Sequence, residues 1–257
     1  MKVAYCTNVW PIDEIPNACK KLKELGYDGV ELWHQYIVSR SIEQIHREVL
    51  DLGLEVAQVC PYFNVTGTQA ELEDTYKLAS QYTEIARALR CSRIRVFTGT
   101  VGASVATENE YNQGVNALRE ICQAAPDLMF VLETHKGCLM ESTESTKRLI
   151  CDVGVDNLRV NLQVPMEISG EDPYDCAELL GEYTAHLHAH NWRGDINNLV
   201  CLSEGDYDFA KFLSILKVKG FDGYISIEHG DHFSKEDPFQ VAAKEIAYLK
   251  RIIGGQQ

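Results

Sequence analysis

Basic side chains are scarce in this chain of 257 residues, which carries 24 Lys and Arg against 38 Asp and Glu, for a formal net charge of −14. Such a surface repels phosphate backbones over about a Debye length, ~8 Å at physiological salt. We therefore expect no nucleic-acid partner. A neutral small molecule suits this balance of charge best.

Long apolar runs are also missing. The chain contains no stretch of about 18 apolar residues, so we expect no transmembrane helix and no membrane partner. Residues 1–6 enter strand-like sequence directly and lack the apolar core and the small-residue cleavage site of a signal peptide. Together these features predict a cytoplasmic protein.

Closely spaced cysteine pairs are absent. Nine cysteines are scattered along the chain, and no two of them have the C-x-x-C spacing. A chain of this length does not need disulfides to stabilise its core. The pattern therefore favours reduced, mostly buried thiols over a disulfide framework or a cysteine metal site.

What the chain does have is a regular alternation of strand-like and helix-like patterns. Candidate strands lie at 2–8, 28–33, 55–60, 92–98, 128–135, 157–164, 184–190 and 223–229, and helical patterns lie near 13–25, 41–52, 70–89, 108–124, 143–151, 173–181, 208–219 and 236–253. This order predicts an α/β fold, a single (β/α)8 TIM barrel domain over residues 1–257. A doubly wound open sheet is the alternative, but it usually carries a Gly-rich phosphate loop, and residues 7–11 are not one.

Four consecutive strand patterns in the second half each end with a side chain that can bind a metal. Because a strand sends alternate side chains to opposite faces, Glu133, Gln163, His188 and Glu228 each lie opposite the apolar face of their own strand. Active sites of such barrels lie at the carboxyl ends of the strands. We therefore expect these four side chains to converge at one rim.

Two carboxylates, one imidazole and one amide oxygen suit one divalent metal ion: Mn²⁺, Mg²⁺, Co²⁺ or Zn²⁺. Taken singly, each residue has a simpler explanation, such as an ion pair, a loop cap or a hydrogen-bonded core histidine. Taken together at matching depth on neighbouring strands, they favour a functional site. Buried carboxylates need either a cation or hydrogen-bond donors to offset their desolvation.

The sequence resembles the xylose isomerase-like barrel superfamily of sugar isomerases, epimerases and dehydratases. The resemblance covers nearly the whole chain and is sharpest in three segments. They are Leu-Glu-Thr-His-Lys-Gly at 132–137, His-Leu-His-Ala-His-Asn at 186–191, and the run from 204 to 228, which is similar to the pattern GEGxxD … GYDGxxxxE.

The resemblance implies one metal held by a Glu, an Asp, a His and a Glu on strands 5 to 8, which correspond here to Glu133, Gln163, His188 and Glu228. Gln163 departs from the usual Asp, and Met166 stands where many members have a substrate-binding His. An amide oxygen still binds a hard cation, but one negative charge is lost, so weaker metal binding or a different metal is expected.

The resemblance further implies that Glu133 and Glu228 are the catalytic acid and base. Candidate substrate-binding residues are His135, Arg193, Trp33 and His190. For each of these four, a structural role is an equally good interpretation: a hydrogen-bonded rim histidine, a surface ion pair or a packed aromatic side chain. Glu31 ends the same strand pattern as Trp33, and Arg95 is expected to line the barrel in a structural role.

The function implied is a metal-dependent isomerase or epimerase of a small sugar, polyol or keto-acid derivative, acting by proton transfer through an enediolate. Three alternatives stay open. They are a dehydratase of an inosose- or dehydroshikimate-like substrate, a non-catalytic sugar-binding descendant, and, less favoured, a DNA-repair endonuclease of the same fold. A carbohydrate-like substrate is the expected partner, and a homo-oligomer remains possible.

Overall fold

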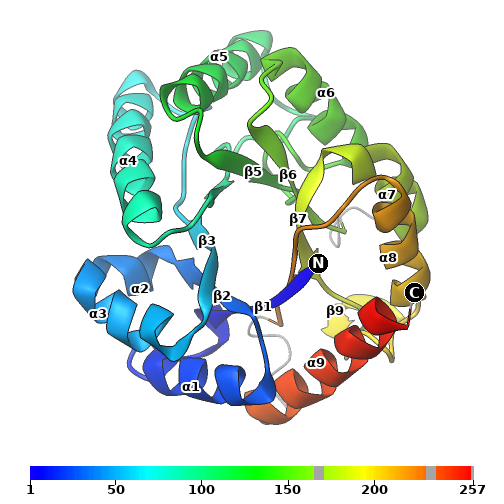
Figure 1. The fold of residues 1–257 in the computed structure, drawn as a ribbon. Coiled ribbons are helices and arrows are strands. Elements are labelled where there is room, and N and C mark those ends of the chain that lie inside the picture. Colours follow the sequence, from blue (N-terminus) through cyan, green and yellow to red (C-terminus); the bar gives the residue numbers. More distant parts are fainter. Residues whose placement is uncertain (165–170, 230–235, 256–257) are drawn as a thin grey trace.

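Eight parallel strands close into a barrel in the computed structural model, which describes residues 1–164, 171–229 and 236–255. The strands neighbour one another in chain order, and the first pairs with the last to close the ring (Figure 1). They are β1 (Lys2–Cys6), β2 (Gly29–Trp33), β3 (Glu55–Cys60), β4 (Arg93–Val96), β5 (Met129–Glu133), β6 (Leu158–Gln163), β7 (Thr184–Ala189) and β10 (Tyr224–Ile227).

Helices surround the barrel on the outside (Figure 1). They are α1 (Ile15–Leu25), α2 (His34–Val38), α3 (Ile42–Glu48), α4 (Gln69–Ala88), α5 (Glu108–Ala124), α6 (Thr143–Val153), α7 (Pro173–Leu180), α8 (Phe209–Val218) and α9 (Pro238–Gly254). Short 3-10 turns occupy Thr7–Val9, Leu50–Leu52 and Gly181–Tyr183. The predicted (β/α)8 barrel is confirmed.

Local sequence sets where the helices begin and end. Ser41, Thr68, Thr107 and Ser142 each cap a helix start through a reciprocal capping box, which satisfies amide groups that lack a partner within the helix. Gly26 follows α1 with φ +90°, a backbone conformation that favours glycine. These signals explain why most predicted helix bounds agree with the structure within a few residues.

Three elements differ from the sequence prediction. The helical pattern at 41–52 is broken, because Val49 leaves helical geometry (φ −129°, ψ −64°) and a 3-10 turn follows. A short helix, α2, directly follows β2. The segment between the predicted strand 184–190 and the predicted helix 208–219 contains an antiparallel hairpin of β8 (Trp192–Arg193) and β9 (Asp195–Leu199).

The two faces of the strands have different chemistry. Side chains that face the helices are apolar and fully buried, among them Leu132, Leu162, Leu187 and Ile227. Side chains of the other face are largely polar and equally buried; they include Glu31, Gln58, Asn161, His186 and Ser226. Interiors of such barrels are usually filled by branched apolar side chains. Buried polar groups need partners, so this interior is a place to look for function.

Two further observations concern the whole chain. All nine cysteines are free thiols, and eight of them are buried. Within the described ranges, every helix is too short or too polar to cross a bilayer.

Candidate active site

Strands β5, β6, β7 and β10 bring the four predicted metal ligands together around one imidazole nitrogen. His188 Nδ1 lies 3.0 Å from Glu228 Oε2, 3.4 Å from Gln163 Oε1 and 3.7 Å from Glu133 Oε1. The strand register explains this meeting, since His188 pairs with Gln163 on one side and with Ser226 on the other. The predicted convergence at the rim is therefore what the structure shows.

The other ring nitrogen of His188 faces into the barrel. Its Nε2 lies 3.1 and 3.2 Å from the two carboxylate oxygens of Glu31. Burial by itself lowers the pKa of His188, but the carboxylates of Glu31, Glu228 and Glu133 outweigh it and hold the pKa well above its ordinary value. The ring of His188 therefore has acidic groups at both of its nitrogens.

Glu31 is the best-partnered carboxylate inside the barrel. It accepts hydrogen bonds from Gln58 Nε2 at 2.6 Å and from His186 Nε2 at 2.7 Å, in addition to its contacts with His188. Burial opposes its ionisation, but His188 and His186 lower the pKa of Glu31 well below its ordinary value. His186 itself has a lowered pKa because it is fully buried.

Glu133 pairs with Arg95 of the neighbouring strand β4. Arg95 Nη1 lies 3.1 Å from Glu133 Oε2, and both side chains are buried. The guanidinium also lies over the rings of Phe97 and Tyr62, 4.7 and 4.9 Å from their centroids. Two guanidinium nitrogens, Nε and Nη2, have no hydrogen-bond partner among the described residues.

Glu228 is held between two histidines. Its Oε2 lies 3.0 Å from His188 Nδ1 and 3.1 Å from His190 Nε2. Burial raises the pKa of Glu228, but these two rings more than offset it and bring the pKa well below the ordinary value. His190 thus lies directly against a predicted catalytic group.

A pocket opens above these residues and includes one of the predicted substrate contacts. It is lined by Glu228, Glu31, Arg95, Trp33 and Tyr62, and also by Cys6, Thr7, Asn8 and Cys60. Tyr62 is 51% exposed at this rim and stacks on Phe97. The enclosed space is small, about 20 Å³ or room for about one water, and it is bordered by carboxylates, a guanidinium and aromatic rings.

Two other predicted contacts lie outside that lining. His135 packs its ring edge-on against Phe97, and its Nδ1 lies 2.9 Å from the Lys136 carbonyl oxygen. Arg193 is exposed in the β8–β9 hairpin, where its guanidinium donates to the Glu204 carbonyl oxygen. Met166 lies outside the described residues. The roles of His135 and Arg193 toward a substrate stay predictions.

Sequence reasoning assigned no role to Glu31, Gln58, Asn161 or His186, although all four surround the inner side of His188. Asn161 Nδ2 and Gln58 Nε2 lie 3.0 and 3.2 Å from His188 Nε2. A signal for them exists, because each is a polar residue alternating with apolar neighbours on a strand. The pattern indicates an inward direction, but it does not indicate which side chains meet.

The side chains around His188 Nδ1 form a set of possible ligands for a cation. Glu133, His188 and Glu228 each offer a ligand atom within 4.8 Å of the others, and oxygen or nitrogen ligands around one ion at ~2.0–2.6 Å lie that close together. Gln163 adds an amide oxygen near the same ring nitrogen. The residues present therefore fit one divalent ion with a mixed oxygen and nitrogen shell.

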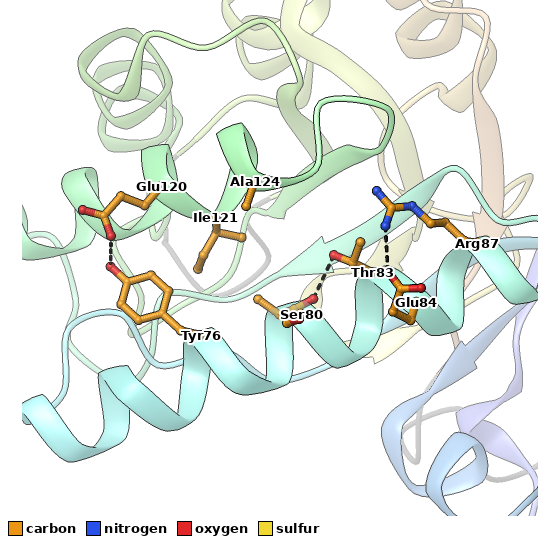
Figure 2. A pocket seen from close by; sticks show the side chains of 9 residues that line it. Tyr76, Ser80, Thr83, Glu84, Arg87, Glu120, Ile121 and Ala124 are labelled. Carbon is orange, nitrogen blue, oxygen red and sulfur yellow. Dashed lines mark hydrogen bonds and ion pairs between the residues drawn. The ribbon is translucent and has the colours of Figure 1, made fainter.

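A roomier groove, about 400 Å³, lies elsewhere, between α4 and α5 on the outside of the barrel (Figure 2). Its polar side chains are already paired: Tyr76 donates to Glu120, and Arg87 pairs with Glu84 and Asp127. None of its lining residues comes from the carboxyl end of a strand. The barrel mouth, not this groove, is therefore the candidate site.

Comparison with known families agrees with this geometry. Residues 19–252 match the model of the family described as xylose isomerase-like TIM barrel. The chain belongs to this family. The resemblance found in the sequence motifs is thereby confirmed.

Two curated relatives along most of the chain are dehydratases. The chain is 27% identical over 239 residues to a 3-dehydroshikimate dehydratase of Bacillus anthracis, covering 83% of this chain and 84% of the relative. It is 22% identical over 292 residues to an inosose dehydratase of Clostridium botulinum, covering 97% and 96% of the two chains.

Solved structures show the same fold. A probable 3-DHS dehydratase from Bacillus anthracis superposes with a TM-score of 0.82 at 24% identity, covering 97% of this chain and 99% of that one. An L-ribulose 3-epimerase gives 0.81 at 17% identity, with 99% and 95% covered. A xylose isomerase-like barrel protein from Mycobacterium smegmatis in complex with magnesium gives 0.78 at 14% identity, with 99% and 97% covered.

Proposed function

We propose that this protein is a metal-dependent lyase that removes water from a small polyhydroxylated carbonyl compound of the inosose or dehydroshikimate type. Its curated relatives along most of the chain are dehydratases, which favours this reaction over the isomerase or epimerase that the sequence motifs led us to expect. The single observation that carries the proposal is the cluster of three oxygen ligands around His188 Nδ1.

In this proposal Glu133, Gln163, His188 and Glu228 hold one divalent ion. When bound, the ion supplies a Lewis acid that stabilises negative charge developing on the carbonyl oxygen of the substrate. Two carboxylates and one amide balance the charge of a divalent ion without excess.

The chain's own carboxylates do the proton transfer. Glu228 lines the pocket and has a lowered pKa, so its ionised form accepts the proton from the carbon beside the carbonyl. The hydroxyl on the next carbon then departs and takes this proton as water, so the carboxylate ends as it began. In this step Glu228 both accepts and returns the proton; Glu133, the other predicted catalytic carboxylate, lies on the Arg95 side of His188 and takes part as a ligand.

Substrate recognition falls to the rim side chains. Arg95 lines the same pocket, and its guanidinium charge attracts a carboxylate or hydroxyl group of the substrate. Trp33 lines the same pocket and offers an apolar face to a ring. His190, held on Glu228, restricts where that carboxylate points. His135 and Arg193 remain proposed contacts at greater distance from the acidic cluster.

The test is a product analysis with Mg²⁺- or Mn²⁺-loaded protein and a panel of 3-dehydroshikimate, inososes and ketohexoses. A product lighter than its substrate by one water supports the lyase. A product of unchanged mass but altered configuration supports the epimerase, which shares the same paired glutamates. No turnover, together with no metal binding, would favour the non-catalytic alternative.

A further inference from the structure

Glu31 is a buried carboxylate that has no role in the proposed reaction. It lies in the middle of β2, on a strand that does not neighbour β7, with a side chain only 3% exposed. Its carboxylate accepts hydrogen bonds from Gln58 and His186 and lies 3.6 Å from Cys60 Sγ, while the Thr7 hydroxyl donates to its backbone carbonyl oxygen. A buried charge held by this many partners is fixed in place rather than free to rotate.

The fixed carboxylate faces one nitrogen of His188. Both of its oxygens lie within 3.2 Å of His188 Nε2, whereas the opposite nitrogen, Nδ1, faces Glu133, Gln163 and Glu228. A neutral imidazole carries its hydrogen on one nitrogen and a lone pair on the other. A carboxylate beside Nε2 favours the hydrogen there, which leaves the Nδ1 lone pair directed at the ligand cluster.

We propose that Glu31 is a positioning residue for the metal site: it fixes the tautomer and orientation of His188 and makes its Nδ1 a stronger ligand. The proposal rests on the proposed function, because it needs a cation at Nδ1. It also explains how the metal site tolerates Gln163 in place of an acidic ligand. A hydrogen bond from Nε2–H to a carboxylate raises the electron density of the ring, which offsets part of the charge that Gln163 lacks.

The neighbouring amides offer a competing hydrogen-bond arrangement. Asn161 Nδ2 and Gln58 Nε2 also approach His188 Nε2, at 3.0 and 3.2 Å. If these amides donate to Nε2, that nitrogen is an acceptor and Nδ1 carries the hydrogen. One feature opposes this: the bare lone pair of Nε2 would then face both carboxylate oxygens of Glu31, at 3.1 and 3.2 Å.

The experiment compares Mg²⁺ binding by calorimetry in the wild type, in Glu31→Gln and in the control variant Glu55→Gln. Gln is isosteric with Glu but accepts a weaker hydrogen bond, so Glu31→Gln should bind Mg²⁺ about 10–100-fold more weakly. Glu55 lies on β3 and contacts Lys2 and Tyr224, away from the ligand cluster, so its variant should bind as the wild type does.

A second measurement holds even if Glu31→Gln does not fold. In ¹⁵N-histidine-labelled wild type with Mg²⁺, the His188 signal should show a hydrogen on Nε2 shifted strongly downfield by the carboxylate. A hydrogen on Nδ1, or an Nε2–H without that shift, would overturn the proposal. In folded Glu31→Gln the shift should disappear.

The outcomes separate the two proposals. If the wild type binds no divalent ion, the proposed function is wrong, and so is the positioning role of Glu31. A wild type that binds Mg²⁺, with Glu31→Gln binding equally tightly, leaves the function standing and removes only the role of Glu31.

Discussion

Arg95 and Glu133 form a buried ion pair, with Nη1 and Oε2 3.1 Å apart and side chains 8% and 3% exposed. The pair joins β4 to β5 within the candidate site, since Glu133 is one of the predicted ligands and Arg95 lines the pocket. A buried pair of this kind fixes geometry, because breaking it leaves one charge without a partner in a place that water does not reach.

We expect Arg95→Met to lower the free energy of unfolding by about 3–5 kcal/mol, since it removes the guanidinium that pairs with Glu133 Oε2. Urea denaturation measures the change. The double variant Arg95→Met/Glu133→Leu serves as the control, because it removes both charges and should recover much of the loss. If the double variant is less stable than Arg95→Met, the ion pair does not account for the contribution of Arg95 to stability.

Divalent ions should stabilise the folded chain. An ion that binds the folded state alone, at a concentration of 100 times its dissociation constant, adds about 2.7 kcal/mol, or roughly 5–10 °C in Tm for a chain of this size. Thermal melts with and without Mg²⁺ or Mn²⁺ test this, and a chelator should reverse the effect. The variant Glu133→Gln/Glu228→Gln should lose the shift; if it keeps it, the ion binds elsewhere.

Gln163→Asp should strengthen binding of Mg²⁺ by roughly tenfold, because it adds a negative charge to the ligand set. Gln163→Asn is the matched control, since Asn has the same shorter side chain but no charge. Calorimetry on both variants separates charge from length. Equal affinities of the Asp and Asn variants would show that residue 163 does not reach the ion.

Glu228→Gln should reduce kcat/KM on an identified substrate by roughly 10²–10⁴-fold, because it removes the proposed proton acceptor while keeping the side chain's size. Glu178→Gln, an exposed residue paired with Lys219, should leave activity unchanged. Circular dichroism confirms that both variants are folded. Retention of full turnover by Glu228→Gln would refute its catalytic role.

Much of the fold could be predicted from the sequence. Apolar positions at period 2 predicted the strands, and the longer periods between them predicted the helices, because each element must bury one face locally. Capping residues such as Thr68 and Thr107 marked helix starts through contacts within three residues. The hairpin β8–β9 escaped prediction, since β8 is only two residues long and carries no periodic signal.

The candidate ligands could be predicted for a similar reason. Glu133, Gln163, His188 and Glu228 end neighbouring parallel strands, and the carboxyl ends of such strands meet at one edge whatever the remaining sequence. The order of the strands in a barrel therefore predicted that these four side chains lie close together.

The sequence by itself determined the barrel, the direction of each strand's side chains and the rim that carries the acidic groups. Only the tertiary structure decided that Glu31 faces His188, that Arg95 pairs with Glu133, and which nitrogen of His188 is directed at the ligands. Glu31 and His188 are 157 residues apart and lie on strands that are not neighbours. Their contact exists because barrel closure brings opposite walls together, and periodicity along a strand contains no information about what lies across the interior.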